Sequence, residues 1–382
     1  MADTMTPKER VIAAINLEEP DRVPCSIMFN YFVARWAGVT IAEYINDIKL
    51  QADLAREYFE KLGAIDAVQV MPPGLSNDPI NRLTFMPIKM KIPGKDEDMD
   101  PNSIPQYDEF ELMPADGYDM VIEKGWARFV KEDLVPRAFP DYAIEDSQFS
   151  AVDDGYDPKS EHRFYEEKNV FLYSGIPLNI PFEMFSFSRS MEKFTVDLYR
   201  RPEKVIAAMD AIMPELLDQT ITVIKDSRSP VFIPTCRGSN GFISPGQFER
   251  FVFPQLKVAV ETVVSHGSPV YFHLDQKWTK FLPYFREFPE GRYVLHFDGA
   301  TDIFKAKEVI GDRMCIMGDV PAPLFVVEGP DEVRGYCRKL IDVIGKGGGF
   351  ILASGCTVPD NAKFENVKAM IDIAKTYHPP RQ

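Results

Sequence analysis

The stretch from residue 229 to residue 275 decides the fold. It opens with Ser229-Pro-Val-Phe-Ile-Pro-Thr-Cys-Arg237 and closes with Ser268-Pro-Val-Tyr-Phe-His-Leu-Asp275, two short apolar runs rich in β-branched and aromatic residues. Between them, 244–266 has helical spacing, with Ser244 and Gln247 as a capping box at its start and Gly267 at its end. Two buried strands joined by one helix predict a parallel strand–helix–strand unit.

The same alternation extends over most of the chain. Strand candidates lie at 22–29, 64–71, 169–175, 229–235, 268–273, 292–297, 313–318 and 349–354, and helical segments lie at 202–226, 244–266, 301–310, 331–344 and 362–377. Eight strands alternating with helices predict a single α/β domain over residues 1–382, a (β/α)8 TIM barrel. An open doubly wound sheet is the alternative, but no glycine-rich phosphate loop follows the first strand.

One region interrupts the alternation. Residues 75–165 are rich in Pro, Asp, Glu and Gly, with short alternating pieces at 120–123 and 127–130. We interpret this region as hairpins and loops inserted after the second strand, over the mouth of the barrel. A surface loop region with no role at the barrel mouth would explain the composition equally well.

Composition excludes several classes of protein. Lys and Arg number 43 and Asp and Glu 58, a net charge of −15, which disfavours binding to nucleic acid. No apolar run reaches the roughly 18 residues of a membrane span, and the first residues lack a signal-peptide pattern. The five cysteines are widely spaced, so we expect reduced thiols in a cytoplasmic enzyme. The oligomeric state stays open, and a homodimer is compatible with the sequence.

Candidate chemical groups follow the strands, where barrel enzymes place their active sites. They are Cys25 to Tyr31, Cys236, Arg237, His273, Asp275, His296, Asp298, Asp319 and Cys356. His273 and Asp275 are two residues apart at a strand end, so both side chains can point the same way. With Cys356 they make three competent zinc ligands and leave an open position. The alternative is a hydrogen-bonded barrel histidine beside an aspartate that caps a helix.

The candidate residues outside this set of three have simpler structural interpretations. We expect Cys25, Cys236, Cys315 and Cys337 to be packing residues, and Asp298 to be a polar partner of the substrate or of a metal ligand. Apolar side chains after the first and third strands could line a substrate pocket: Met28, Phe29, Tyr31, Phe182 and Phe185. Alternatively, these side chains pack the insertion onto the barrel.

Several phrases then resemble the uroporphyrinogen decarboxylase superfamily. They are Thr6-Pro-Lys-Glu-Arg-Val11 with Glu19-Pro-Asp-Arg-Val-Pro24, Ile243-Ser-Pro-Gly-Gln-Phe-Glu-Arg-Phe-Val-Phe-Pro254, Met317-Gly-Asp-Val-Pro321, and Gly347-Gly-Gly-Phe-Ile-Leu-Ala-Ser-Gly-Cys-Thr-Val-Pro359. They span nearly the whole chain in the family's order, and the resemblance implies the same barrel. True decarboxylases carry several arginines after the first strand to hold the carboxylates of the porphyrinogen. Here Cys25 to Trp36 contains only Arg35.

The other branch of the superfamily comprises corrinoid-linked methyltransferases. Their pattern of His-x-Cys after the fifth strand and Cys after the eighth, all binding zinc, maps to His273, Asp275 and Cys356. Asp275 departs from it, since the pattern has cysteine there. A carboxylate is a harder ligand than a thiolate and favours a metal that polarises oxygen.

The resemblance therefore implies a zinc-dependent methyltransferase. We expect it to move a methyl group from a small methylated donor, in particular a methoxylated aromatic, to the cobalt of a corrinoid on a partner protein. Asp275 and Asp298 are the expected catalytic acids, with an aromatic ring stacked near Phe29 and Tyr31. A decarboxylase of a smaller substrate and a non-catalytic barrel that binds a tetrapyrrole or a corrinoid protein remain as alternatives.

Overall fold

The protein is a β/α barrel in the computed structural model, which describes residues 3–63, 65–69, 79–142, 158–173, 176–227 and 230–378. The strands are β1 (Cys25–Met28), β2 (Ala67–Gln69), β3 (Lys89–Lys91), β4 (Gln106–Asp108), β5 (Phe171–Leu172), β6 (Ile176–Pro177), β7 (Val231–Thr235), β8 (Val270–Leu274), β9 (Tyr293–Phe297), β10 (Cys315–Val320) and β11 (Phe350–Ser354). Each of the eight predicted strand ranges overlaps an observed strand, and β8 and β10 extend one and two residues beyond their predicted ends.

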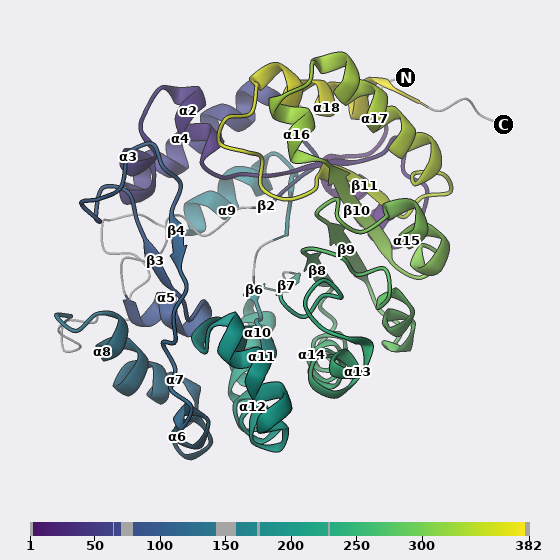
Figure 1. The fold of residues 1–382 in the computed structure, drawn as a ribbon. Coiled ribbons are helices and arrows are strands. Elements are labelled where there is room, and N and C mark those ends of the chain that lie inside the picture. The colour runs from purple at the N-terminus through teal and green to yellow at the C-terminus, as the bar shows by residue number, and fades with distance from the viewer. Residues whose placement is uncertain are drawn as a thin grey trace.

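Helices α10 to α18 cover the outside of the sheet (Figure 1). The α-helices are α1 (Pro7–Ile15), α2 (Phe32–Ala37), α3 (Ile41–Asn46), α4 (Ile48–Leu62), α5 (Pro79–Phe85), α6 (Gly117–Lys124), α7 (Trp126–Phe129), α8 (Val135–Ala138), α9 (Pro158–Glu167), α10 (Pro181–Ser188), α11 (Met191–Arg200), α12 (Pro202–Ser227), α13 (Pro245–Gln247), α14 (Phe253–Ser265), α15 (Ile303–Ile310), α16 (Ala322–Val326), α17 (Pro330–Val343) and α18 (Phe364–Thr376). Two π-helical turns, η1 (Val130–Leu134) and η3 (Phe248–Val252), and the 3-10 helix η4 (Leu282–Glu287) complete the set. Within the described ranges, no helix is both long and apolar enough to cross a bilayer.

The main sheet of the described residues has nine strands. Its order is β5-β2-β1-β11-β10-β9-β8-β7-β6, and every neighbouring pair is parallel. The predicted strand at 169–175 contains β5, and β6 begins just beyond its end. β5 pairs with β2 at one edge of the sheet, and β6 pairs with β7 at the other. Only residues 173–175 separate β5 from β6 along the chain, so the two edges of the curled sheet are joined by a short stretch of sequence.

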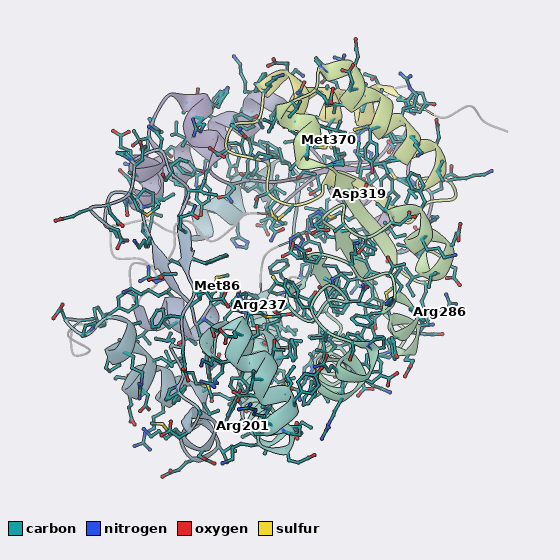
Figure 2. The ribbon with its side chains drawn as sticks, in the orientation of Figure 1. Met86, Arg201, Arg237, Arg286, Asp319 and Met370 are labelled. Atoms are coloured by element: carbon teal, nitrogen blue, oxygen red, sulfur yellow. The ribbon has the colours of Figure 1, made fainter. Side chains whose placement is uncertain are left out.

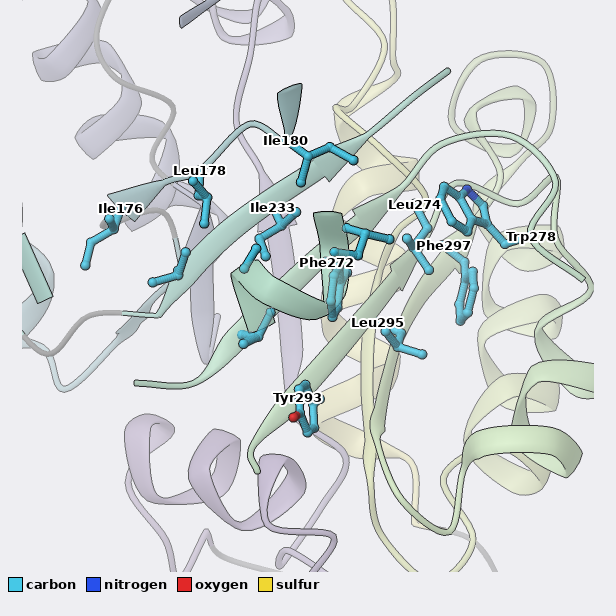
Figure 3. Packing of buried hydrophobic residues seen from close by; sticks show 14 of the residues in the cluster. Ile176, Leu178, Ile180, Ile233, Phe272, Leu274, Trp278, Tyr293, Leu295 and Phe297 are labelled. Carbon is cyan, nitrogen blue, oxygen red and sulfur yellow. The ribbon is translucent and has the colours of Figure 1, made fainter. Parts of the chain in front are cut away.

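Alternation along the strands divides the core into two parts. On β8 and β9, Phe272, Leu274, Leu295 and Phe297 belong to the large cluster under the helices, as Figure 3 shows. Their neighbours Tyr271 and Val294 belong to a smaller cluster inside the barrel. His273 and His296 alternate with the outward-facing residues, so their side chains enter the interior near the ends of these strands.

A buried network of ion pairs accounts for the charged residues Arg10, Asp21 and Arg22 of the first family phrase. The guanidinium of Arg10 bonds Asp21 at 2.6 Å and Asp66 at 2.5 Å, and Arg22 bonds Asp66 at 2.7 Å. The second carboxylate oxygen of Asp66 also accepts the backbone N–H of Cys25 at 2.9 Å. The network thus ties α1 and the starts of β1 and β2 together, at the end of the barrel opposite its mouth.

Asp66→Asn should lower the free energy of unfolding by about 3 kcal/mol, because it leaves two buried guanidinium groups with only Asp21 and the more exposed Asp3 as charged partners. The measurement is the midpoint of urea unfolding. Asp312→Asn is the matched control, since the pair between Arg286 and Asp312 is exposed and should contribute less than about 1 kcal/mol. Equal losses in the two variants would contradict this account of the network.

The insertion is more helical than expected. β3 and β4 form an antiparallel pair, but the pieces predicted as extended at 120–123 and 127–130 lie in α6, α7 and the start of η1. Tyr118 and Val121 are buried three residues apart, and Trp126, Phe129 and Val130 repeat the helical spacing. That spacing overrides the short alternation on which the prediction was based. Residues 75–78 and 143–157 of the predicted insertion lie outside the described residues.

Candidate metal centre at the barrel mouth

Three side chains from two strand ends converge at the carboxyl end of the barrel. His273 is the fourth residue of β8, Asp275 directly follows that strand, and Cys356 lies two residues beyond β11. The N–H of Asp275 donates to the carbonyl of Thr235 on β7 at 3.1 Å, which extends the strand pairing and fixes its backbone. Strand pairing therefore positions two of the three groups.

The spacing of these groups fits one metal ion. Nε2 of His273 lies 3.2 Å from Oδ1 of Asp275 and 3.4 Å from Sγ of Cys356, and the three ligand atoms lie within 4.8 Å of one another. Ligands at about 2.1–2.3 Å from a tetrahedral zinc ion are separated by roughly 3.4–3.6 Å. Imidazole, carboxylate and thiolate are also the usual donors to zinc. The residues present can hold such an ion.

His296 orients the imidazole of His273. Nε2 of His296 donates to the carbonyl of Ser354 at 2.8 Å, because a carbonyl can only accept. Nδ1 of neutral His296 is then an acceptor, with Nδ1 of His273 at 3.0 Å and the hydroxyl of Tyr271 at 2.7 Å. The hydroxyl of Tyr271 also donates to Oε1 of Gln69 at 3.2 Å, which leaves the acceptor to His273. His273 therefore carries a proton on Nδ1, and its Nε2 faces Asp275 and Cys356. The sequence placed His296 among the candidate groups at the strand ends, but it did not predict this role beside His273.

The pKa values of the two histidines are shifted in opposite directions. Burial disfavours a charged imidazole, but the hydrogen bond and the charge of Asp275 raise the pKa of His273 to about 10. Burial, together with the positive charge of His273, lowers the pKa of His296 to about 3. His296 is thus a neutral acceptor at pH 7, as the hydrogen bonding requires.

His296→Leu should weaken zinc binding about 10–100-fold, because the metal ligand loses the acceptor that fixes its tautomer and ring orientation. Competition for zinc with a chromophoric chelator measures the change. His266→Leu, at an exposed position after α14, should leave the affinity unchanged. If His296→Leu binds zinc as tightly as the parent protein, this histidine does not orient His273.

Cys236 lies at the site, contrary to its interpretation as a packing residue. Its Sγ is 3.0 Å from Oδ2 of Asp275, the oxygen that does not face His273. The loop that carries Cys236 is held by Glu183, whose carboxylate accepts the backbone N–H groups of Cys236, Arg237 and Gly238 at 2.8–3.0 Å. Burial raises the pKa of Glu183 to about 7. The other three cysteines named as core residues are buried.

Asp298 lies beside the metal group. Its carboxylate accepts the N–H of Gln276 at 2.7 Å and that of Ala300 at 2.8 Å, so it holds the residue that directly follows Asp275. Burial raises its pKa. These contacts give Asp298 a positioning role toward Asp275. Asp319 is buried and accepts the hydroxyl of Tyr336 at 2.8 Å.

The predicted substrate residues separate into two groups. Phe182 packs on Phe194 with ring centroids 5.0 Å apart, Phe185 packs on Tyr118 at 5.5 Å, and Phe29 belongs to the large outer cluster. These three rings are at most 5% exposed, as the alternative interpretation of packing expects. Met28 alternates with Ile27 of the outer cluster and so faces the interior at the mouth, and Tyr31 is only partly buried.

The fold and the site together define a β/α-barrel protein with a candidate metal centre at its mouth. Residues 161–377, more than half of the chain, match the uroporphyrinogen decarboxylase (URO-D) family. The chain belongs to this family.

Curated relatives come from both branches. A uroporphyrinogen decarboxylase of Methylococcus capsulatus is 33% identical over 89 residues, which cover 23% of this chain and 25% of that protein. The methylcobamide:CoM methyltransferase MtaA of Methanosarcina barkeri is 30% identical over 78 residues, 20% of this chain and 22% of that protein. The matched segments thus span about a quarter of each relative.

A solved structure matches the whole fold. A methyltransferase from Methanosarcina mazei superposes with a TM-score of 0.64 over 97% of this chain and 98% of that chain, at 18% sequence identity. This likeness confirms the barrel.

Proposed function

We propose that the protein is a zinc-dependent methyltransferase that demethylates a small methoxylated aromatic compound and passes the methyl group to the cobalt of a corrinoid carried by a separate protein. The observation that carries the proposal is the convergence of His273, Asp275 and Cys356. The similarity to the methylcobamide:CoM methyltransferase supports the class of reaction.

The donor set favours chemistry at oxygen. One imidazole, one carboxylate and one thiol make a harder set than one imidazole with two thiols. A zinc ion held by these residues would supply Lewis acidity toward the oxygen that the methyl group leaves. The carbon–oxygen bond breaks, the oxygen keeps the bonding pair, and cobalt in its reduced state provides the pair for the new bond to carbon.

The remaining residues orient this set. His296 fixes the proton on Nδ1 of His273, Cys236 contacts Asp275, and Asp298 holds the backbone after Asp275. Met28 and Tyr31 are the predicted substrate residues whose position suits contact with an aromatic ring at the mouth.

Decarboxylation of a porphyrinogen is disfavoured, because the arginines after strands β1 and β7 are already engaged. Arg35 bonds Asp360 at 2.8 Å, and Arg237 bonds the carbonyl of Ser186 at 2.7 Å and Glu109 at 3.1 Å. A polycarboxylate would need free cations in their place.

The test uses zinc-loaded protein, free cob(I)alamin or a reduced corrinoid protein as acceptor, and a panel of methoxybenzenes. We expect the visible spectrum of the reduced cobalt to change to that of methylated cobalt with at least one donor. A parallel incubation with uroporphyrinogen should release no carbon dioxide. No methylation with any donor, together with carbon dioxide release, would overturn the proposal.

A further inference from the structure

The antiparallel pair β3–β4 is anchored beside the candidate metal centre. Glu109, which directly follows β4, accepts a bond from Arg237 at 3.1 Å and from the N–H of Met191 at 2.6 Å. Four residues on, the N–H of Met113 donates to the carbonyl of Ser188 at 2.7 Å. Arg237 is adjacent in sequence to Cys236, so the anchor holds β4 next to a residue that contacts Asp275. Figure 2 labels Arg237 near the centre of the view, between the barrel strands and the pair β3–β4.

Tyr107 points toward the mouth for the same geometric reason. It lies in β4, two residues before Glu109, which directly follows the strand, and the alternation of side chains along a strand places these two residues on the same face. Partial burial of the phenol, followed by its electrostatic interaction with Cys236, Asp275 and Cys356, raises the pKa of Tyr107. Across the mouth, the pKa of Tyr31 is raised to about 12 by burial and by Tyr107.

We propose that Tyr107 is a catalytic residue whose hydroxyl donates a hydrogen bond to the oxygen that the methyl group leaves. The inference rests on the proposed function, since the leaving oxygen must lie beside the metal ligands, and these are the groups that the phenol faces. The leaving oxygen gains negative charge as its bond to carbon breaks, and a fixed donor in a partly dehydrated site stabilises that charge. The phenol keeps its proton, so no further reactant is required.

In this proposal the inserted segment supplies a catalytic hydroxyl, a function that a surface loop region away from the mouth would not have. The insertion carries a hydroxyl group to a barrel mouth where the strand ends supply mainly acidic and thiol groups. Tyr107 is 58% exposed, so its ring presents an apolar surface to water. A bound aromatic donor would cover this surface.

Tyr107→Phe tests the inference with a series of methoxybenzenes that carry 4-substituents of increasing electron withdrawal. Loss of one oxyanion donor should lower kcat about 10²-fold for methoxybenzene itself, with KM and bound zinc unchanged. The loss should shrink for 4-nitromethoxybenzene, because its leaving oxygen holds less charge. Tyr199→Phe, an exposed tyrosine on α11, is the matched control and should behave as the parent protein.

Glu109→Gln provides a second variant that keeps the phenol but weakens its anchor to Arg237. Its kcat should fall by a smaller factor than in Tyr107→Phe, and the loss should again shrink as the 4-substituent withdraws more electrons. Rates that are unchanged in Tyr107→Phe, or lowered by one factor for every donor, would overturn the inference while leaving the proposed function intact. Inactivity of the parent protein toward the whole series would instead remove the proposed function.

Discussion

His273→Ala is expected to lose bound zinc and to lower methyl transfer about 10³-fold. Lewis acid stabilisation of a leaving oxygen contributes several kcal/mol to the transition state, and about 4 kcal/mol corresponds to that factor. The effect should be this large because Nε2 of His273 is the atom that lies close to both other candidate ligands. Zinc content by elemental analysis and the rate of cobalt methylation are measured on the same samples.

His266→Ala is the control for this experiment. His266 is exposed after α14, on the side of the barrel opposite the mouth, and should change neither zinc content nor rate. Chelation of zinc from the parent protein should reproduce the loss, and added zinc should restore the rate. A zinc-free His273→Ala protein with the parental rate would show that the metal is not needed for the reaction.

Asp275→Cys is expected to keep zinc and to slow demethylation of a methoxybenzene by about 10–100-fold. A second thiolate gives more electron density to the ion, so it polarises a leaving oxygen less, and a change of about 1.4–2.7 kcal/mol in the barrier gives this range. The new thiol also removes the carboxylate oxygen that faces Cys236. Rates with a methoxybenzene are compared with rates with a methylated thiol under the same conditions.

The methylated thiol serves as the internal reference. Because sulfur is a soft leaving atom, Asp275→Cys should slow its demethylation less than that of the oxygen donor. Asp312→Cys, an exposed substitution far from the mouth, controls for an added thiol. An equal or faster rate with the methoxybenzene in Asp275→Cys would refute the role given to the harder ligand.

The sequence predicted the barrel because its strands are short, apolar and separated by well-capped helices. The capping boxes at Thr6 and Ser244 are both present, and every predicted strand range overlaps an observed strand. The placement of β5 and β6 at opposite edges of the sheet could not be predicted, since it depends on which neighbour each strand pairs with.

The three candidate ligands could be predicted from their positions after strands and from the family pattern. The contacts that surround them could not. His296 and Cys236 were named as candidates at the strand ends, but their contacts with His273 and Asp275 depend on the register between β7, β8 and β9, which no local pattern encodes. Tyr107 is 129 residues before Cys236 in the chain, and only the tertiary anchor at Glu109 brings it to the mouth. The helices of the insertion were missed because short alternating pieces fit a strand and a helix almost equally well.

X-ray absorption at the zinc edge of the purified, zinc-loaded protein tests the metal centre most directly. The account predicts one zinc per chain with one sulfur ligand at about 2.3 Å and nitrogen or oxygen ligands at about 2.0–2.2 Å. The sulfur should disappear in Cys356→Ala and persist in Cys236→Ala. A protein that binds no zinc, or a sulfur ligand that persists in Cys356→Ala, would contradict a centre formed by His273, Asp275 and Cys356.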